Sequence, residues 1–346
     1  MKKSKGKGML AVGGLVAAAG IAVSIYIGSL SEICQVTTYS MGSYVQQSIY
    51  GKGKEEAAQT AANAVDQLED DISWKIEGSD IQRLNQNAGK GFIKIEENSY
   101  QILKLAADVF ETGGAFDITI APVSRLWDFD AEKHTVPDGE LISSMLPNVD
   151  GNALKLGDNS TAALNSAVNA VELGAVGKGA ACDTAAAVYK NSDVSAAIIS
   201  VGGSVGLYGS KLFGSPWEVL IRDPDSGAGG MGTLFLKGGF VSTSGNYEKA
   251  FEQDGVLYHH ILDPATGYPA DSGLKSVTVW TASSGALSDA LSTACFVMGE
   301  EDSRELLKLY GAEAVFITSE NKVIVTEGLE GKFELTGELF ELKIEN

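Results

Sequence analysis

The residues best suited to hold a metal ion are Asp289 and Thr293, which lie four positions apart in a segment with helical spacing. Residues four apart share one face of an α-helix, so their carboxylate and hydroxyl oxygens would point the same way. Oxygen ligands suit Mg²⁺, which keeps several waters and takes substrate phosphates as further ligands. The alternative is structural, with an aspartate that interacts with its own helix dipole and a solvated threonine.

A glycine-rich segment, Val171–Asp183, is the candidate phosphate site. Its pattern predicts a strand that runs into a Gly-Lys-Gly turn and then a helix. Free backbone N–H groups and the positive end of the helix dipole favour a phosphate at such a place. Lys178 would add a point charge, and Asp183 would lie in the first turns of the helix. The segment is neither a Walker A loop nor a dinucleotide fingerprint, and a turn without a ligand is the alternative.

Two of the three histidines, His259 and His260, lie together before an Asp-Pro-x-Thr-Gly turn. A histidine near a phosphoester can act as a general acid or base. The structural alternative is that His259 points to solvent and His260 bonds the turn.

Trp127 and Phe129 follow an apolar run that predicts a strand, and their rings could stack on a flavin or adenine. Core packing is the alternative for this aromatic pair.

The charge of the chain excludes one class of partner. The formal net charge is −19, and residues 1–30 contain four lysines and no acid, so the remainder is more acidic still. A body this acidic does not suit a nucleic-acid backbone.

The cysteines Cys34, Cys182 and Cys295 are too few and too uneven for a disulfide framework. Cys182 and Cys295 are expected to be small core residues.

The N-terminus predicts a membrane anchor. Lysines at positions 2, 3, 5 and 7 precede an uncharged run from Met9 to Leu30, which is long enough to cross a bilayer as a helix. No small-residue cleavage site follows the run, so a signal-anchor is favoured over a cleaved signal peptide. The basic tip would stay in the cytoplasm and place the body outside. We therefore expect a basic tip and transmembrane segment over 1–33 and a single domain over 34–346.

The body must position these groups with mixed helices and strands. Helices are expected over Lys54–Ile76, Ser99–Thr112, Lys178–Asn191, Ser288–Met298 and Glu301–Leu309. Strands are expected over Gln35–Tyr50 with a turn at Met41-Gly42, and over Ala167–Leu173, Ala196–Val201, Glu218–Arg222, Thr233–Leu236, Lys275–Trp280, Ala314–Ile317, Val323–Val325 and the tail past Gly331. The elements do not alternate regularly, so the fold class is α+β in two lobes rather than a doubly wound sheet.

Seven segments, in this order, resemble the ApbE family of FAD:protein FMN transferases. They are Met41–Ser43, Phe116–Pro122, Leu173–Gly179, Val201–Gly203, Thr243–Gly245, His260–Pro269 and Asp289–Thr293. The resemblance covers roughly Cys34 to Ile317. It implies a T-fold-like α+β body with an FAD cleft between two lobes. Departures from the family pattern stand at Glu172, Ala180 and Asn246, and they leave the implied metal ligands in place.

The resemblance also implies roles for particular residues. Asp289 and Thr293 would bind Mg²⁺ together with the backbone carbonyl of Ala175. Glu172 and Lys178 would flank the bound nucleotide. The remaining implied contacts to FAD come from Met41, from the aromatic residues Trp127 and Phe129, and from His260 and Ile261 beside the pyrophosphate. His260 or Asp183 would accept the proton of the acceptor hydroxyl, and the sequence does not choose between them.

The implied reaction is Mg²⁺-dependent transfer of FMN from FAD to a threonine or serine hydroxyl of an acceptor protein, with release of AMP. Because the body is expected outside the membrane, the acceptor would be an exported or membrane protein with an FMN-binding domain. Two alternatives remain open. One is an FAD pyrophosphatase that yields FMN and AMP, and the other is a flavin-binding surface protein without chemistry, which would not depend on a divalent cation.

Overall fold

The computed structural model describes residues 32–211, 214–226 and 229–345. Within these residues, no helix has both the length and the apolar character needed to cross a bilayer. The anchor predicted over Met9–Leu30 lies outside the described residues.

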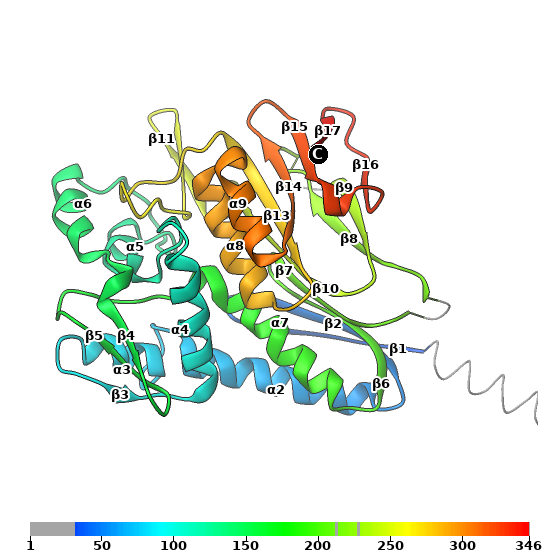
Figure 1. The fold of residues 1–346 in the computed structure, drawn as a ribbon, viewed down its shortest axis with the longest axis horizontal. Helices are drawn as coiled ribbons and strands as arrows, with labels where there is room; N and C mark the ends of the chain where they lie inside the picture. The colour runs from blue at the N-terminus through cyan, green and yellow to red at the C-terminus, as the bar shows by residue number, and fades with distance from the viewer. Residues whose placement is uncertain (1–31, 212–213, 227–228, 346) are drawn as a thin grey trace, which may run out of the picture.

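The centre of the fold is a nine-stranded sheet in the order β1-β2-β6-β7-β10-β13-β14-β15-β17 (Figure 1). Neighbouring strands are antiparallel up to β15, and β17 joins parallel to β15. The strands span Ile33–Ser40, Ser43–Gly51, Val194–Val201, Ser204–Gly209, Gly239–Gly245, Leu274–Thr281, Glu313–Thr318, Lys322–Thr326 and Glu341–Glu345. β1 and β17 form the two outer edges.

Helices cover one face of this sheet. α2 (Lys54–Ile72), α7 (Gly174–Lys190) and α8 (Gly285–Met298) pack across it, and α9 (Glu300–Tyr310) follows α8. The apolar residues of α2 recur at helical spacing, with Ala61, Val65 and Leu68 all buried. Together with the inward side chains of the strands they form the main core of the molecule.

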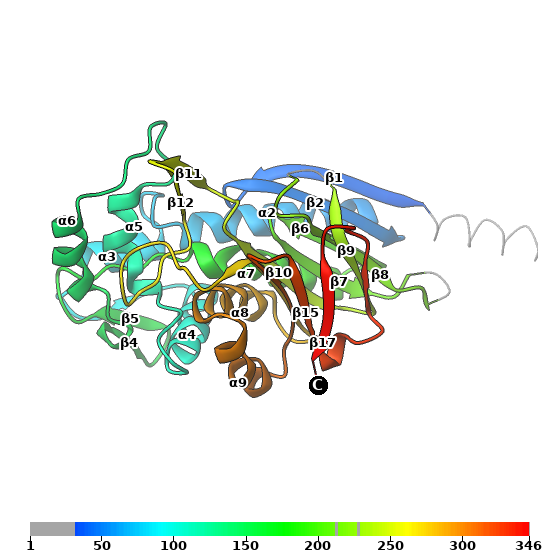
Figure 2. The same cartoon turned by 90° about the horizontal axis from the view of Figure 1, so that it is seen from above.

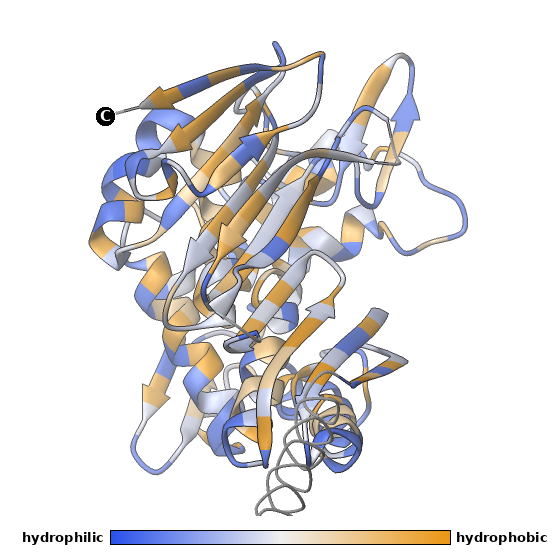
Figure 3. Cartoon of the chain, turned by 90° about the vertical axis from the view of Figure 1, so that its right-hand side faces the viewer, coloured by the Kyte–Doolittle hydropathy of each residue, from blue (hydrophilic) through white to orange (hydrophobic). Residues whose placement is uncertain are grey.

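The other face is covered by a three-stranded sheet of β8 (Trp217–Arg222), β9 (Gly230–Leu236) and β16 (Phe333–Leu335). Along β8, Trp217, Val219 and Ile221 are buried while the residues between them are exposed, which is the two-residue period of a half-buried strand. These side chains meet Val315 and Val323 of the large sheet in a second core. Figure 3 shows the alternation of apolar and polar residues along β17, which ends at the C mark.

A smaller lobe lies beyond the helices, at the left of Figures 1 and 2. It contains a small sheet in the order β3-β5-β4 and the separate hairpin β11-β12. Its helices are α3 (Asp80–Gln86), α4 (Glu97–Phe110), α5 (Ala121–Trp127) and α6 (Gly139–Met145), and its strands are β3 (Ile93–Lys94), β4 (Leu154–Gly157), β5 (Thr161–Leu164), β11 (Ala250–Gln253) and β12 (Val256–His259). The α+β class is therefore confirmed.

Most expected elements are present, but two segments next to the glycine-rich motif were predicted wrongly. Ala167–Leu173 is not a strand, since β5 ends at Leu164. α7 begins at Gly174 rather than at Lys178, so the Gly-Lys-Gly segment lies inside the helix. The apolar run before Trp127 is a short 3-10 helix that leads into α5, not a strand. In both regions, packing against neighbouring elements outweighs the local preference of the sequence.

Candidate active site

One cavity of about 820 Å³ collects nearly all the predicted site residues. It lies where the β1–β2 turn, the C-terminal end of α2, the loop after α5, the start of α7, β10 and α8 meet. Among the residues that line it are Met41, Phe129, Glu172, Ala175, Lys178, His260, Ile261, Asp289 and Thr293. These residues are far apart in the sequence, so the fold brings the predicted functional groups together.

The crossing of α7 over α8 builds the floor of this cavity. A Cβ on Gly179 would lie 2.0 Å from the carbonyl oxygen of Gly285, and one on Gly285 would lie 2.4 Å from that of Gly179. Only glycine fits at both positions, because any side chain would overlap the other helix backbone. The two helices therefore approach at backbone contact, and the short side chains near the crossing can reach across.

Two carboxylates use this crossing in opposite directions. Asp183 of α7 accepts hydrogen bonds from Ser284 Oγ (2.7 Å) and from the backbone N–H groups of Gly285 (2.7 Å) and Ala286 (2.9 Å). It thus satisfies the open N-terminal donors of α8. Asp289 of α8 accepts a hydrogen bond from the N–H of Gly179 at 2.9 Å. Asp183 supports the floor, whereas Asp289 faces the cavity.

Asp289 is the candidate metal ligand and is only 4% exposed. Burial raises the pKa of its carboxyl, and the opposing effects of Lys178 and the Gly179 N–H do not offset it. In a regular helix the N–H of Gly179 is directed at the carbonyl of Ala175, so its bond to Asp289 places the carboxylate beside that carbonyl. A cation at this position would compensate the buried negative charge.

The donor set around Asp289 fits Mg²⁺. Thr293 lies one turn further along α8, and its hydroxyl is 3.2 Å from that of Ser244 on β10. Within the described residues no three His, Cys, Asp or Glu side chains cluster as a complete metal cage. One carboxylate, one hydroxyl and one carbonyl match the way Mg²⁺ binds, with waters and substrate phosphates as its other ligands.

His260 supplies a neutral imidazole to the cavity. Its Nδ1 lies 2.9 Å from the backbone carbonyl of Glu248, which can only accept, so Nδ1 carries the proton and Nε2 keeps a lone pair. Burial, together with the nearby charges of Lys178 and Lys249, lowers the pKa of the ring to about 4. The ring is therefore unprotonated at neutral pH and can accept a proton.

The mouth of the cavity is bridged by ion pairs. Asp130 contacts Lys75 at 2.5 Å and Lys249 at 2.7 Å, and all three side chains are about half exposed. The two lysines hold the pKa of Asp130 at about 2. These residues come from the end of α2, the loop after α5 and the segment before β11. Their pairing ties three separate segments together over the site.

Three of the seven non-glycine residues with positive φ among the described residues line the same cavity. Met41, Asp128 and Lys249 line it, and each has a positive φ, at 56°, 40° and 41°. A residue with a side chain rarely adopts this conformation, and such residues are typical of binding and catalytic sites. At the opposite wall, Glu172 accepts a bond from the N–H of Gly174 at 2.7 Å at the start of α7, and burial raises the pKa of its carboxyl.

A match to a family model places this geometry among known proteins. The model described as the ApbE family matches residues 41–316, which is most of the chain. The chain belongs to the ApbE family. This match runs from Met41 past the candidate metal ligands Asp289 and Thr293 on α8.

Individual ApbE-family relatives agree with this assignment. An FAD:protein FMN transferase from Treponema pallidum is 30% identical, covering 92% of this chain and 94% of the relative. One from Escherichia coli K12 is 29% identical over 84% and 85% of the two chains. The crystal structure of an ApbE protein from Thermotoga maritima superimposes with a TM-score of 0.79 at 28% identity, covering 87% of this chain and 99% of that one.

Two residues assigned to the ApbE site by sequence lie elsewhere. Asp183 does not line the cavity, and its oxygens are taken up by the N-terminus of α8, so it is not placed to accept a substrate proton. Trp127 is 2% exposed, and its Nε1 donates to the carbonyl of Gly267 at 2.8 Å. Phe129 stacks on Trp127 with ring centres 5.6 Å apart and lines the cavity in its place.

Several lining residues carried no signal in the sequence. Lys75, Asp130 and Lys249 have no motif or spacing that links them. Asp117 lies inside a segment that supported the family resemblance, but it was not assigned a role. It is buried, and its carboxylate accepts bonds from Thr119 and from the N–H of Gly151. Only the three-dimensional fold reveals that these four residues share one cavity.

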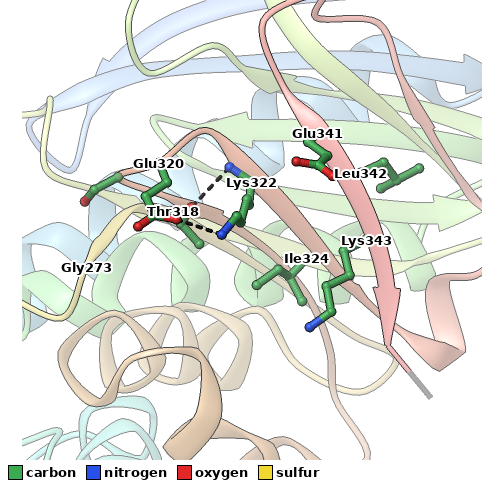
Figure 4. Close-up of a pocket in the computed structure, with 9 residues that line it drawn as sticks. Gly273, Thr318, Glu320, Lys322, Ile324, Glu341, Leu342 and Lys343 are labelled. Carbon is green, nitrogen blue, oxygen red and sulfur yellow. Dashed lines mark hydrogen bonds and ion pairs between the residues drawn. The ribbon is translucent and has the colours of Figure 1, made fainter.

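A second hollow lies between β14, β15 and β17 and is shown in Figure 4. Two of its charged groups pair with each other, with Lys322 Nζ 2.7 Å from Glu320, and the backbone N–H of Lys322 donates to Thr318 Oγ1 at 3.1 Å. None of the predicted site residues lines it. The candidate active site is therefore the larger cavity at the α7–α8 crossing.

Proposed function

We propose that this protein transfers FMN from FAD to a threonine or serine hydroxyl of an acceptor protein. The observation that carries the proposal is the cavity itself, where Lys178 of α7, buried Asp289 of α8 and neutral His260 line one space in an ApbE-family chain. The curated relatives named above are FAD:protein FMN transferases, which supports the same activity here.

In the proposed reaction the acceptor hydroxyl attacks the FMN phosphorus of FAD. A new phosphoester bond forms, the bond to the AMP oxygen breaks, and AMP leaves with the electron pair. Nε2 of His260 accepts the hydroxyl proton, because its lone pair is free and the ring is unprotonated at neutral pH. Lys178 balances negative charge on the pyrophosphate as that bond breaks.

A divalent cation, which we propose to be Mg²⁺, belongs to this mechanism. Asp289, Thr293 and the carbonyl of Ala175 would hold it, and it would supply charge neutralisation at the phosphates. The carboxylate of Asp289 then serves as a fixed anchor whose position is set by its bond to Gly179.

We further propose that the protein acts outside the cytoplasmic membrane, held by a single N-terminal helix. The support is the sequence alone, with four lysines followed by an uncharged run over Met9–Leu30. The acceptor would then be an exported or membrane protein with an FMN-binding domain. Carbonate extraction of membranes, with protease added to intact spheroplasts, tests both the anchor and the side on which the body lies.

The test of the activity uses the full chain in detergent with FAD, MgCl₂ and a purified FMN-binding domain that contains a candidate threonine. The expected result is an acceptor whose mass rises by one FMN less water, with AMP released in equal amount. Chelation of the metal by EDTA and the Asp289→Ala variant should each abolish the mass gain. Tight FAD binding without AMP release under every condition would contradict the proposal.

A further inference from the structure

β1 is an outer strand of the nine-stranded sheet and pairs only with β2 among the described residues. Met41 and Gly42 both have positive φ, so they form a two-residue turn of the kind that closes tight hairpins. The residues flanking such a turn, Ser40 and Ser43, exchange both backbone hydrogen bonds. This fixes the register of the whole hairpin.

From that register, alternate residues of β1 direct their backbone groups away from β2. Counting back from Ser40, the even-numbered residues of β1 bond to β2, and the odd-numbered residues point outward. The outward set is Ile33, Gln35, Thr37 and Tyr39. The exposed rings of Tyr39 and Tyr44 meet edge to face, with their centres 5.7 Å apart. This contact agrees with the register, because the side chains of opposite residues lie closest where the two residues do not exchange hydrogen bonds.

Within the part of the chain that the structure describes, this edge lacks the charges, prolines and bulges that usually protect an edge from pairing with another strand. Ile33–Ser40 contains no charged residue and no proline, and its register with β2 is unbroken by a bulge. The opposite edge, β17, carries charged residues at Glu341 and Lys343. Proteins normally blunt an exposed edge with such charges, so the bare edge of β1 suits a strand that is added when a partner binds.

The edge leads directly into the active-site cavity. Ser40 ends β1 and is buried, with its hydroxyl 2.8 Å from Glu69, and the next three residues, Met41 to Ser43, all line the cavity. Figure 2 shows the turn of the β1–β2 hairpin pointing toward the smaller lobe, and the residues of this turn line the cavity. A strand laid along β1 would therefore deliver the residues at its end to the cavity mouth.

We propose that the acceptor protein binds as an extended segment that adds a strand to the free edge of β1, with the hydroxyl residue to be modified just beyond the paired stretch. This inference rests on the proposed transferase function. The acceptor is favoured over a second copy of this chain, since two chains of net charge −19 repel each other. Main-chain pairing would give affinity without demanding particular side chains.

The test compares two substitutions at the centre of the outward set. Thr37→Pro removes an outward N–H, and proline is tolerated at this kind of position in an edge strand. Thr37→Ala changes the exposed side chain but keeps the N–H, and it is the matched control. With the full chain, FAD, Mg²⁺ and an FMN-binding domain, we expect Thr37→Pro to raise the KM for the acceptor about tenfold or more. Thr37→Ala should leave that KM within about twofold.

AMP release from FAD without acceptor reports the state of the FAD site separately. It should be the same in both variants and the parent. If the parent itself neither releases AMP nor modifies the acceptor, the proposed function fails, and not the docking inference alone. Thr37→Lys, which introduces a natural edge-blocking charge, is a second probe in case Thr37→Pro does not fold.

Two results would overturn the docking inference. One is an acceptor KM that stays unchanged in Thr37→Pro and Thr37→Lys while transfer proceeds. The other is sedimentation showing that the parent is a dimer that Thr37→Pro converts to a monomer, which would mean that the edge binds a second copy of the chain.

Discussion

The floor and the mouth of the active-site cavity are built on different electrostatic principles. At the floor, Asp289 is buried and His260 is partly buried. Burial raises the pKa of Asp289 and lowers the pKa of His260, so both groups favour their uncharged forms. At the mouth, Asp130 is half exposed, and two lysines hold it in the charged form. The electrostatic energy between a desolvated group and a bound phosphate or cation is large, whereas that between a solvated ion pair and the same ligand is small. The chemistry should therefore depend on the floor, and access to the site on the mouth.

The largest effect is expected at Asp289. Asp289→Ala removes the only carboxylate of the proposed cation site, and the transfer rate should fall about 100-fold or more because the charge on the breaking pyrophosphate is no longer neutralised. Single-turnover AMP release at saturating FAD measures the effect. Asp289→Asn keeps the shape of the side chain but removes its charge, and its transfer rate should fall nearly as much. An active asparagine variant would therefore contradict a charge-based role of Asp289.

His260 is expected to give the next largest effect. His260→Gln should lower kcat about 100-fold, the usual contribution of a general base. Since the pKa of His260 is about 4, the parent should show no loss of kcat between pH 8 and pH 5 from this group. A pH–rate profile measures this, and an acid limb near pH 6.5 would show that the imidazole is not desolvated during turnover.

The same lowered pKa has a consequence for stability. His260 binds its proton more weakly in the folded protein than in the unfolded chain, where the pKa is near 6.5. Its contribution to folding is therefore complete above pH 6.5 and is lost as the pH falls toward 4. Urea unfolding at pH 7 and pH 5 should show that His260→Gln has a smaller pH dependence than the parent.

A substitution at Asp183 tests whether this residue supports the structure of the floor without taking part in the reaction. Asp183→Asn weakens the bonds to the N-terminus of α8 and should lower the free energy of unfolding by about 1–2 kcal/mol. The rate per folded molecule should stay within a few-fold of the parent. Denaturant titration and kcat on the same preparation give the two values, and a large drop in kcat at unchanged stability would return Asp183 to a catalytic role.

The smallest effect is expected at the mouth. Asp130→Asn breaks two half-exposed ion pairs and should change the free energy of unfolding by less than about 1 kcal/mol. It should alter the KM for FAD more than kcat, because Lys75 and Lys249 become free to attract the phosphates. Kinetics at low and high salt would show this, and a kcat loss as large as that of His260→Gln would remove the distinction between floor and mouth.

How much the sequence could predict follows the same division. The Asp289–Thr293 pair could be found because its members lie four positions apart, which is helical spacing. The β1–β2 hairpin could be found because Met41-Gly42 interrupts two β-rich runs. The start of α7 was misplaced because its glycines suggested a turn. One of them, Gly179, is in fact needed for contact between two helix backbones, as its close approach to Gly285 shows.

Side chains paired across the fold could not be found from sequence alone. Nothing in the spacing of Lys75, Asp130 and Lys249 links them, because they are joined only through tertiary structure. The contacts of Asp183 with α8 could not be found for a related reason, since its partners there lie about a hundred residues away. Trp127 was expected at the ligand, but the neighbouring Phe129 lines the cavity.

The most direct test of the transferase account is the source of the oxygen that attacks FAD. The full chain is incubated with FAD, Mg²⁺ and an FMN-binding domain in water labelled with heavy oxygen, and AMP, FMN and the modified acceptor are analysed by mass spectrometry. The account predicts unlabelled AMP and an unlabelled FMN–acceptor ester in equal amounts, because the acceptor hydroxyl supplies the oxygen. Labelled FMN or AMP with no modified acceptor would identify water as the nucleophile and contradict it.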